Sequence, residues 1–224
     1  MKVLHLLQNS LPLISGSTIR SKYIFKYQKK FSKIFVLTSF LFKSKKNLEI
    51  IDHIPYYRIN NRIAFLLSKY FSYIKRFNNI FYEFFNIDLE NKYQYFLISV
   101  LMKYYIRKLV KFYKIDIIHQ HTHYEVGRYA LKVAKKQKIP FIYEVRGFLE
   151  ENLIANTKYR KNINLKLIKH IYNKMKTNET NLIKKSDLII TLSDSMKKEL
   201  LKRNIKEEKI KIIPNCTDTD LLQP

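Results

Sequence analysis

The chain has 224 residues, 46% of them hydrophobic, which is enough apolar material for a substantial core and excludes a wholly disordered protein. Its single cysteine, Cys216, excludes a disulfide framework, and no group of Cys and His residues has the spacing of a structural zinc site. No apolar run is long enough to span a bilayer. We therefore expect a cytoplasmic chain. The net charge of +25 favours partners such as phosphates, nucleic acid or an anionic membrane, although AT-rich coding also produces this Lys-, Ile- and Asn-rich composition.

Short apolar runs alternate along the chain with longer helical patterns. This alternation is typical of βαβ units and a parallel sheet. Several of the runs are wholly apolar, as strands covered on both faces should be. They predict strands at 3–7, 34–38, 54–59, 115–119, 141–144, 188–192 and 211–213. We therefore predict a Rossmann-like α/β fold with about six or seven parallel strands flanked by helices.

Two segments between these strands are predicted to be crossover helices. Residues 17–31, "STIRSKYIFKYQKKF", follow the first strand, and Ser17 or Thr18 can serve as the N-cap. Residues 124–137, "YEVGRYALKVAKKQ", carry an apolar face at helical spacing, formed by Val126, Tyr129, Ala130, Val133 and Ala134.

Residues 61–113 depart from this alternation. They are rich in aromatic and basic residues and contain no glycine or proline. One interpretation is two or three amphipathic helices packed on the sheet. The other is a basic, aromatic face that lies on a membrane surface. Nucleic-acid binding is less favoured, because the segment matches no RRM, KH or OB motif.

The stretch "IIHQHTHYEVG" (117–127) places His119, His121 and His123 at alternate positions, which share one face of an extended chain. A facial three-histidine metal site is therefore admissible. However, the strand is predicted to end here, and Glu125 is the only obvious carboxylate nearby. We predict no metal. At the carboxyl edge of the sheet, His121 is expected to face a ligand, with His119 turned inward as a core histidine whose hydrogen bonds are satisfied and His123 at the rim.

Three motifs together resemble the N-terminal domain of the family-4 retaining glycosyltransferases, which have the two-domain GT-B fold. They are "VLHLLQNSLPLISGSTIRS", "DIIHQHTHYEVGRYALKVAKKQKIPFIYEVRGFLEE" and, after Glu179, "SDLIITLSDSMKKELLKRNIKEEKIKIIPNCTDTDLLQP". The pieces "SLPLISGST" and "YEVRGFLEE" are similar to sequences in the branch of this family that is found in bacterial polysaccharide and exosortase-linked gene clusters. The sequence departs from the family at Ser17 and Cys216, where glycines are usual.

The resemblance implies a domain at 1–213 and the start of an interdomain linker at 214–224. The family's second domain holds most of the nucleotide and the donor sugar, so we expect this chain alone to be inactive. When completed, it is expected to transfer a sugar from a nucleotide sugar to a polysaccharide or lipid-linked acceptor, with retention and without a metal or other cofactor. His121 is the implied catalytic residue, bonding a sugar or acceptor hydroxyl.

The topology adds candidate substrate-binding residues at the same edge of the sheet. The loop and first helical turn after the first strand offer free N–H groups and a helix dipole, which favour an anion. Arg146 can make a bidentate contact with phosphate, or pair with Glu144 or Glu150. The candidates are Gly16, Ser17, Thr18, Arg20, Arg146, Glu150 and Asn215.

The alternative to a glycosyltransferase domain stays open at this point. It is a non-catalytic, basic, Rossmann-like module that binds an anionic membrane or nucleic acid.

Overall fold

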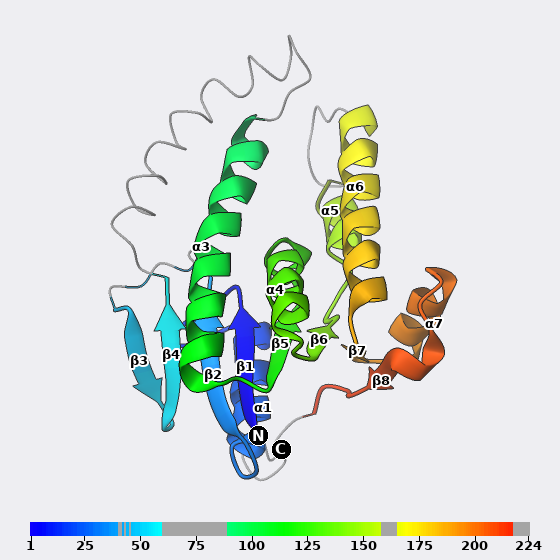
Figure 1. Cartoon of the computed structure of the whole chain (residues 1–224). Helices are drawn as coiled ribbons and strands as arrows, with labels where there is room; N and C mark the ends of the chain where they lie inside the picture. The colour runs from blue at the N-terminus through cyan, green and yellow to red at the C-terminus, as the bar shows by residue number, and fades with distance from the viewer. Residues whose placement is uncertain (40–41, 43, 45, 60–88, 158–164, 217–224) are drawn as a thin grey trace.

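A computed structural model describes residues 1–39, 42, 44, 46–59, 89–157 and 165–216. These residues contain one eight-stranded sheet in the order β3-β4-β2-β1-β5-β6-β7-β8 (Figure 1). The strands are β1 (Lys2–Leu7), β2 (Lys33–Thr38), β3 (Leu48–Ile51), β4 (Ile54–Arg58), β5 (Ile117–His121), β6 (Phe141–Glu144), β7 (Leu188–Thr191) and β8 (Ile210–Ile212). All neighbouring pairs are parallel except β3 and β4. The predicted Rossmann-like α/β fold is confirmed.

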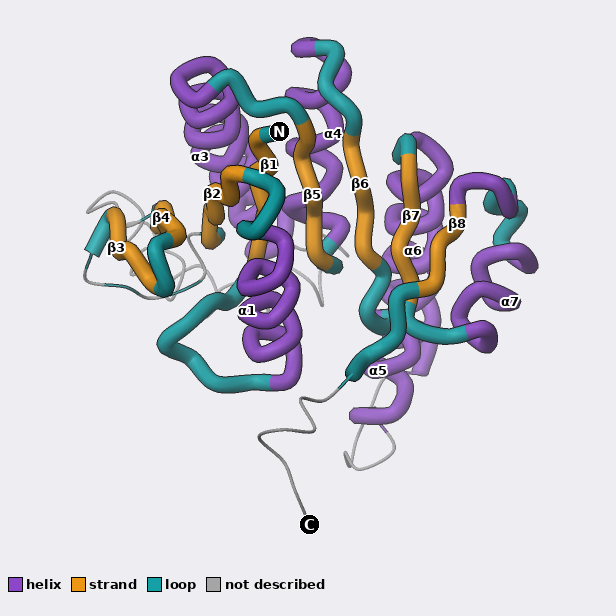
Figure 2. The backbone as a smooth tube through the Cα atoms, turned by 90° about the horizontal axis from the view of Figure 1, so that it is seen from below, coloured by secondary structure: helices purple, strands orange, loops and turns teal. Residues whose placement is uncertain are grey.

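Helices cover both faces of the sheet (Figure 2). One face packs against α3 (Leu89–Tyr113), α4 (Tyr124–Gln137) and α6 (Leu165–Lys185), and α1 (Gly16–Gln28) lies on the other. Two further helices, α5 (Leu149–Thr157) and α7 (Asp194–Lys202), and the short 3-10 helix η1 (Glu207–Lys209) complete the described elements. None of the helices in the described part of the chain combines the length and apolar character that a bilayer span needs.

Strand alternation divides the core between these two faces. Leu4 and Leu6 of β1 join the larger core cluster under α3, α4 and α6, while Val3 and Leu7 pack with Phe25 of α1. His5 lies between Val3 and Leu7, on the face that α1 covers, and the centre of its ring lies 4.5 Å from that of Phe25, with the two planes tilted by 49°. A histidine is thus placed in the apolar layer beneath α1.

Several element boundaries differ from the sequence predictions. The strand predicted at 115–119 runs from Ile117 to His121, because Asp116 instead bonds to the backbone at Lys2 before the strand begins. The N-cap of α1 is Ser15, not Ser17 or Thr18, because Ser15 and Thr18 form a reciprocal capping box. Strand β3 was not predicted. Residues 61–88 of the aromatic, basic segment lie outside the described residues, and α3 confirms a helix in the remainder.

Helix α4 has the predicted bounds, and its predicted apolar face is buried. Gly127 allows this helix to approach the sheet, because a Cβ there would lie 2.7 Å from Leu182 Cδ2 and 3.2 Å from Gln120 and Tyr143 side-chain atoms.

We expect Gly127→Ala to lower the free energy of unfolding by about 1–3 kcal/mol, measured by urea denaturation. At Gly16 a Cβ would meet no atom within 4 Å. Gly16→Ala is the matched control, and an equal loss there would contradict the close-packing argument.

Candidate functional site

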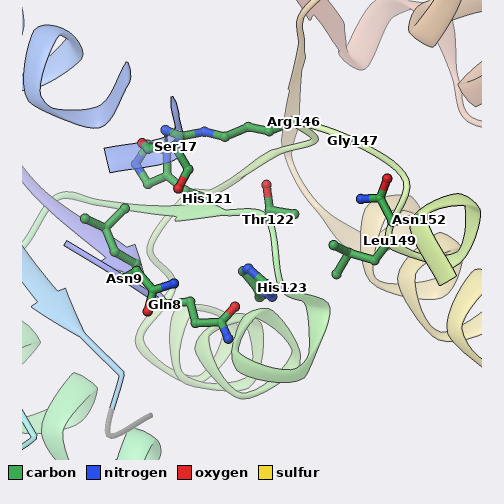
Figure 3. Close-up of a pocket in the computed structure, with 11 residues that line it drawn as sticks. Gln8, Asn9, Ser17, His121, Thr122, His123, Arg146, Gly147, Leu149 and Asn152 are labelled. Atoms are coloured by element: carbon green, nitrogen blue, oxygen red, sulfur yellow. Dashed lines mark hydrogen bonds between the residues drawn. The ribbon is translucent and has the colours of Figure 1, made fainter. Parts of the chain in front are cut away.

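A cavity of about 170 Å³ opens at the carboxyl edge of β1, β5 and β6 (Figure 3). Parallel strands direct the segments that follow them to this edge, where ligands of open α/β sheets bind. The lining comes from the ends of β1 and β5, the start of α1 and the segment from β6 into α5. Its residues are Leu7, Gln8, Asn9, Ser17, His121, Thr122, His123, Arg146, Gly147, Leu149 and Asn152.

Glu144, the last residue of β6, is the centre of the polar network beneath this cavity. It is fully buried, and strand register places it beside His121. Its Oε1 accepts a hydrogen bond from Arg20 Nε at 2.8 Å, and its Oε2 accepts from Arg146 Nε at 3.0 Å and Nη2 at 2.8 Å. Burial alone would raise the pKa of Glu144, but His121, Arg146 and His119 hold that pKa well below its ordinary range. The carboxylate is therefore ionised.

The two arginines hold other parts of the chain as well. Arg146 Nη1 donates to the Ser17 carbonyl at 2.8 Å and to Ser21 Oγ at 2.9 Å, which ties β6 to α1. Arg20 donates to the carbonyls of Ile213 at 2.9 Å and Pro214 at 3.0 Å and to Asn215 Oδ1 at 3.1 Å. Arg20 and Asn215, both predicted to bind substrate, thus contact each other.

His121 lies at the floor of the cavity with both ring nitrogens in contact with the protein. Its Nε2 lies 2.8 Å from His5 Nδ1 in the interior, and its Nδ1 contacts Glu144 Oε2 and lies 2.6 Å from Arg146 Nη2. Burial, followed by Arg146, lowers the pKa of His121 to about 3. The imidazole is therefore neutral near pH 7.

The three histidines of "HQHTH" do not share one face. His119 is buried, as predicted, but the prediction that its hydrogen bonds are satisfied was wrong, because its buried Nε2 has no hydrogen-bond partner. His123 leaves the strand, because Thr122 and His123 adopt left-handed backbone conformations with φ of 46° and 57°. It lines the cavity rim, as predicted. The histidine that joins His119 and His121 is His5, which strand register pairs with His119.

Candidate ligand nitrogens of His5, His119 and His121 lie within 4.8 Å of one another, which is close enough for a metal ion. In the described structure, however, His5 and His121 use facing nitrogens to bond each other. Arg20 and Arg146 add two positive charges against the single carboxylate of Glu144, which opposes a dication. The absence of a metal stays a prediction.

The comparisons with known proteins identify the family. The model of Glycosyltransferase Family 4 matches residues 53–221, which is more than half of the chain. The chain belongs to glycosyltransferase family 4. A 48-residue stretch is 42% identical to the alpha-monoglucosyldiacylglycerol synthase of Acholeplasma laidlawii, covering 21% of this chain and 12% of that protein.

Two solved structures show the same fold as this family 4 chain. Sucrose-phosphate synthase from Thermosynechococcus elongatus aligns with a TM-score of 0.67 and 11% identity, over 100% of this chain and 50% of that one. Anabaena HepE in complex with UDP and glucose aligns with a TM-score of 0.60 and 16% identity, over 99% and 46%. The family 4 chain thus spans about half the length of these structures.

Only some of the predicted site residues of this family 4 chain lie at the cavity. Ser17, His121 and Arg146 line the cavity, and Arg20 adjoins them through Glu144. Thr18 is buried in the capping box. Gly16 is the first residue of α1 and does not have a positive φ. A Cβ at this position would meet no described atom within 4 Å. Neither a tight turn nor a close approach of the chain therefore explains the glycine at this position.

Glu150, predicted to bind substrate, lies inside the domain instead. It is fully buried and forms a 2.7 Å ion pair with Arg203, whose guanidinium also lies 4.1 Å from the centre of the Phe148 ring. The pairing of Arg146 left open between Glu144 and Glu150 is made with Glu144. The cavity residues that were not predicted as site residues are Leu7, Gln8, Asn9, Thr122, Gly147, Leu149 and Asn152. Gln8 directly follows a predicted strand, and Thr122 and Gly147 directly follow predicted site residues.

The same interior region of the family 4 chain contains Glu179, which accepts a hydrogen bond from Tyr143 Oη at 2.7 Å. Burial raises the pKa of Glu179 to about 7. Because the folded state then binds a proton that the unfolded state has lost, stability should fall as pH rises from about 4.5 to 7. We expect the ionisation of Glu179 to lower the free energy of unfolding by about 3 kcal/mol over that pH range. Urea unfolding at pH 5 and pH 8 should show this fall in the parent and its loss in Glu179→Gln; equal falls in both would contradict it.

Proposed function

We propose that this chain is the N-terminal domain of a retaining glycosyltransferase that moves a sugar from a nucleotide sugar to a polysaccharide or lipid-linked acceptor. The observation that carries the proposal is the cavity at the carboxyl edge of the sheet, with Ser17, His121 and Arg146 in its lining, in a chain of family 4. The cavity is small, which fits one wall of a larger cleft.

Electrostatics at the cavity favour an anionic ligand such as a nucleotide diphosphate. Arg20 and Arg146 share one ionised carboxylate, Glu144, and the neighbouring His121 is neutral, so the local charge is net positive. The N-terminal end of α1, with Ser17 at the cavity, adds the positive end of a helix dipole. Both features supply a preorganised positive field where a leaving diphosphate develops charge.

In this proposal His121 bonds a sugar or acceptor hydroxyl through Nδ1, and the hydroxyl replaces the contact that Nδ1 makes with Arg146 Nη2 in the structure. Its Nε2 faces His5 in the interior, whereas Nδ1 lies beside Arg146, which lines the cavity. With a pKa of about 3, His121 positions a hydroxyl as a neutral hydrogen-bonding group. In this proposal the rate enhancement comes from positioning and from stabilising the leaving diphosphate.

The second wall of the cleft is proposed to come from a C-terminal domain that holds most of the donor nucleotide. The match of this chain to about half of the length of the two solved structures supports this division. The name of the Acholeplasma relative, a glucosyl diacylglycerol synthase, and the net charge of +25 support a lipid-linked acceptor at the cytoplasmic face of an anionic membrane.

The proposal is tested with the chain fused to a family 4 C-terminal domain and, in parallel, with the chain alone. Each is incubated with a panel of sugar nucleotides and vesicles of bacterial lipid extract that contain anionic lipids. We expect transfer, and retention at the anomeric carbon, from the fusion only. Sedimentation of the vesicles should carry the chain down at low salt and release it at high salt. Transfer by the chain alone, or none by the fusion with any donor, would contradict the proposed division.

A further inference from the structure

The segment that follows β8 is fastened to α1 by one side chain. Residues 213–216 are exposed and have no regular secondary structure. The Ile213 N–H donates to the Thr191 carbonyl at 2.8 Å, which extends the bonding to β7 by one residue. Figure 2 shows the segment running from β8 to the N-terminal part of α1. There Arg20 contacts it, so a side chain and not a regular element holds this part of the chain.

All three nitrogens of the Arg20 guanidinium are engaged within the chain. Nη1 donates to the Pro214 carbonyl at 3.0 Å and to Asn215 Oδ1 at 3.1 Å, and Nη2 donates to the Ile213 carbonyl at 2.9 Å. Toward the interior, Nε donates to Glu144 Oε1 at 2.8 Å, and Nη2 lies 2.8 Å from the same oxygen. A guanidinium holds its five N–H groups in a rigid, planar fork. One side chain therefore fixes three consecutive residues relative to a buried carboxylate.

These contacts favour a role for Arg20 other than binding substrate. Its side chain is 11% exposed, and it is not among the described residues that line the cavity. A ligand would have to displace one of the bonds within the chain before it could bind this guanidinium. The geometry therefore favours Arg20 as a residue that holds the segment over Arg20 as a contact to substrate.

We propose that Arg20 is a positioning residue that ties residues 213–215 to Glu144 and so sets the direction in which the chain leaves this domain. Glu144 also accepts two hydrogen bonds from Arg146, which lines the cavity, so the segment and the cavity share one buried carboxylate. The consequence for sugar transfer rests on the proposed function. If the second wall of the cleft belongs to a domain that follows this segment, the Arg20 contacts set where that wall lies against His121.

The motion of the segment can be measured at Cys216, which is the single cysteine of the chain, is exposed and directly follows Asn215. A nitroxide spin label on its thiol is observed by electron paramagnetic resonance. We expect the labelled parent to show a slow component. In Arg20→Gln, which removes the guanidinium, the spectrum should narrow to that of a mobile label. Arg20→Lys keeps the charge beside Glu144, but one ammonium cannot also reach three acceptors of the segment, so its label should be mobile as well.

Lys26→Gln, at an exposed position on the same helix, is the matched control and should leave the spectrum unchanged. Thermal unfolding shows which variants are folded. A label as mobile in the parent as in the Arg20 variants would overturn the proposal. An unchanged spectrum in a folded Arg20→Gln would also overturn it, and if that variant does not fold, Arg20→Lys decides by the same criterion.

In the fusion enzyme, Arg20→Lys should lower kcat by about tenfold with little change in the KM for the donor. The reason is that the second domain is proposed to hold the donor, while the position of the donor against the acceptor is lost. Lys26→Gln should keep the parent kcat. A raised KM with the parent kcat would mark Arg20 as a substrate-binding residue and overturn the positioning role. If no variant of the fusion transfers sugar, the proposed function fails, while the spin label still decides whether Arg20 holds the segment.

Discussion

Glu144→Gln should lower the free energy of unfolding by about 3–5 kcal/mol, the cost typical of removing one partner from a buried ion pair. Glu144 is the shared carboxylate of Arg20 and Arg146, and it is fully buried. A neutral amide cannot balance either guanidinium, and its NH₂ group would face donors. Urea denaturation at pH 7 measures the loss.

The surface pair Lys206–Glu208, with both side chains largely exposed, supplies the control. Glu208→Gln should change stability by less than about 0.5 kcal/mol. In the double variant Glu144→Gln, Arg146→Met, we expect a loss smaller than the sum of the two single losses, because one unbalanced guanidinium has been removed. A Glu144→Gln loss as small as that of the control would show that the network does not depend on this carboxylate.

His121→Ala should lower kcat/KM of the fusion enzyme by about 100-fold, which corresponds to roughly 2.7 kcal/mol of transition-state stabilisation. The substitution removes both the proposed contact to a hydroxyl and the contacts of Nδ1 with Glu144 and Arg146. Steady-state kinetics with the donor found in the panel measures the loss.

His170, exposed on α6, provides the matched control, and His170→Ala should keep the parent rate. Because His121→Ala also leaves space beside His5, its thermal unfolding is compared with that of His121→Gln, a less severe change in volume. A folded His121→Ala variant with the parent kcat/KM would exclude His121 from the reaction.

The sheet was predictable because its strands are short apolar runs separated by amphipathic segments, and α4 was predictable to the residue because its apolar face repeats at helical spacing. Strand β3 was missed because its signal is weak. The hairpin to β4 turns at Asp52 and His53, which both have positive φ, where glycine or asparagine would normally announce a turn. Ser15 was missed as the N-cap because three neighbouring residues offer hydroxyls and only the backbone geometry selects one.

The site was only partly predictable. Sequence placed Ser17, His121 and Arg146 at one edge of the sheet, because segments that follow parallel strands gather there. His5 carried a signal, because it is a polar residue within an apolar strand, but only the strand register with His119 shows that it lies among the histidines of the site. Glu150 and Glu144 could not be told apart as partners of Arg146, because that choice depends on how α5 turns away toward Arg203.

The Arg20 contacts have a consequence for the order in which the domain forms. Arg20 is separated by 124 residues from Glu144 and by 193 and 195 residues from Ile213 and Asn215. Such non-local contacts close long loops, so they are expected to form after the local helices and neighbouring strands. During synthesis, β1 and α1 leave the ribosome long before residues 213–215 exist. The polar network below the cavity therefore reaches its full set of hydrogen bonds only once residues 213–215 have been made.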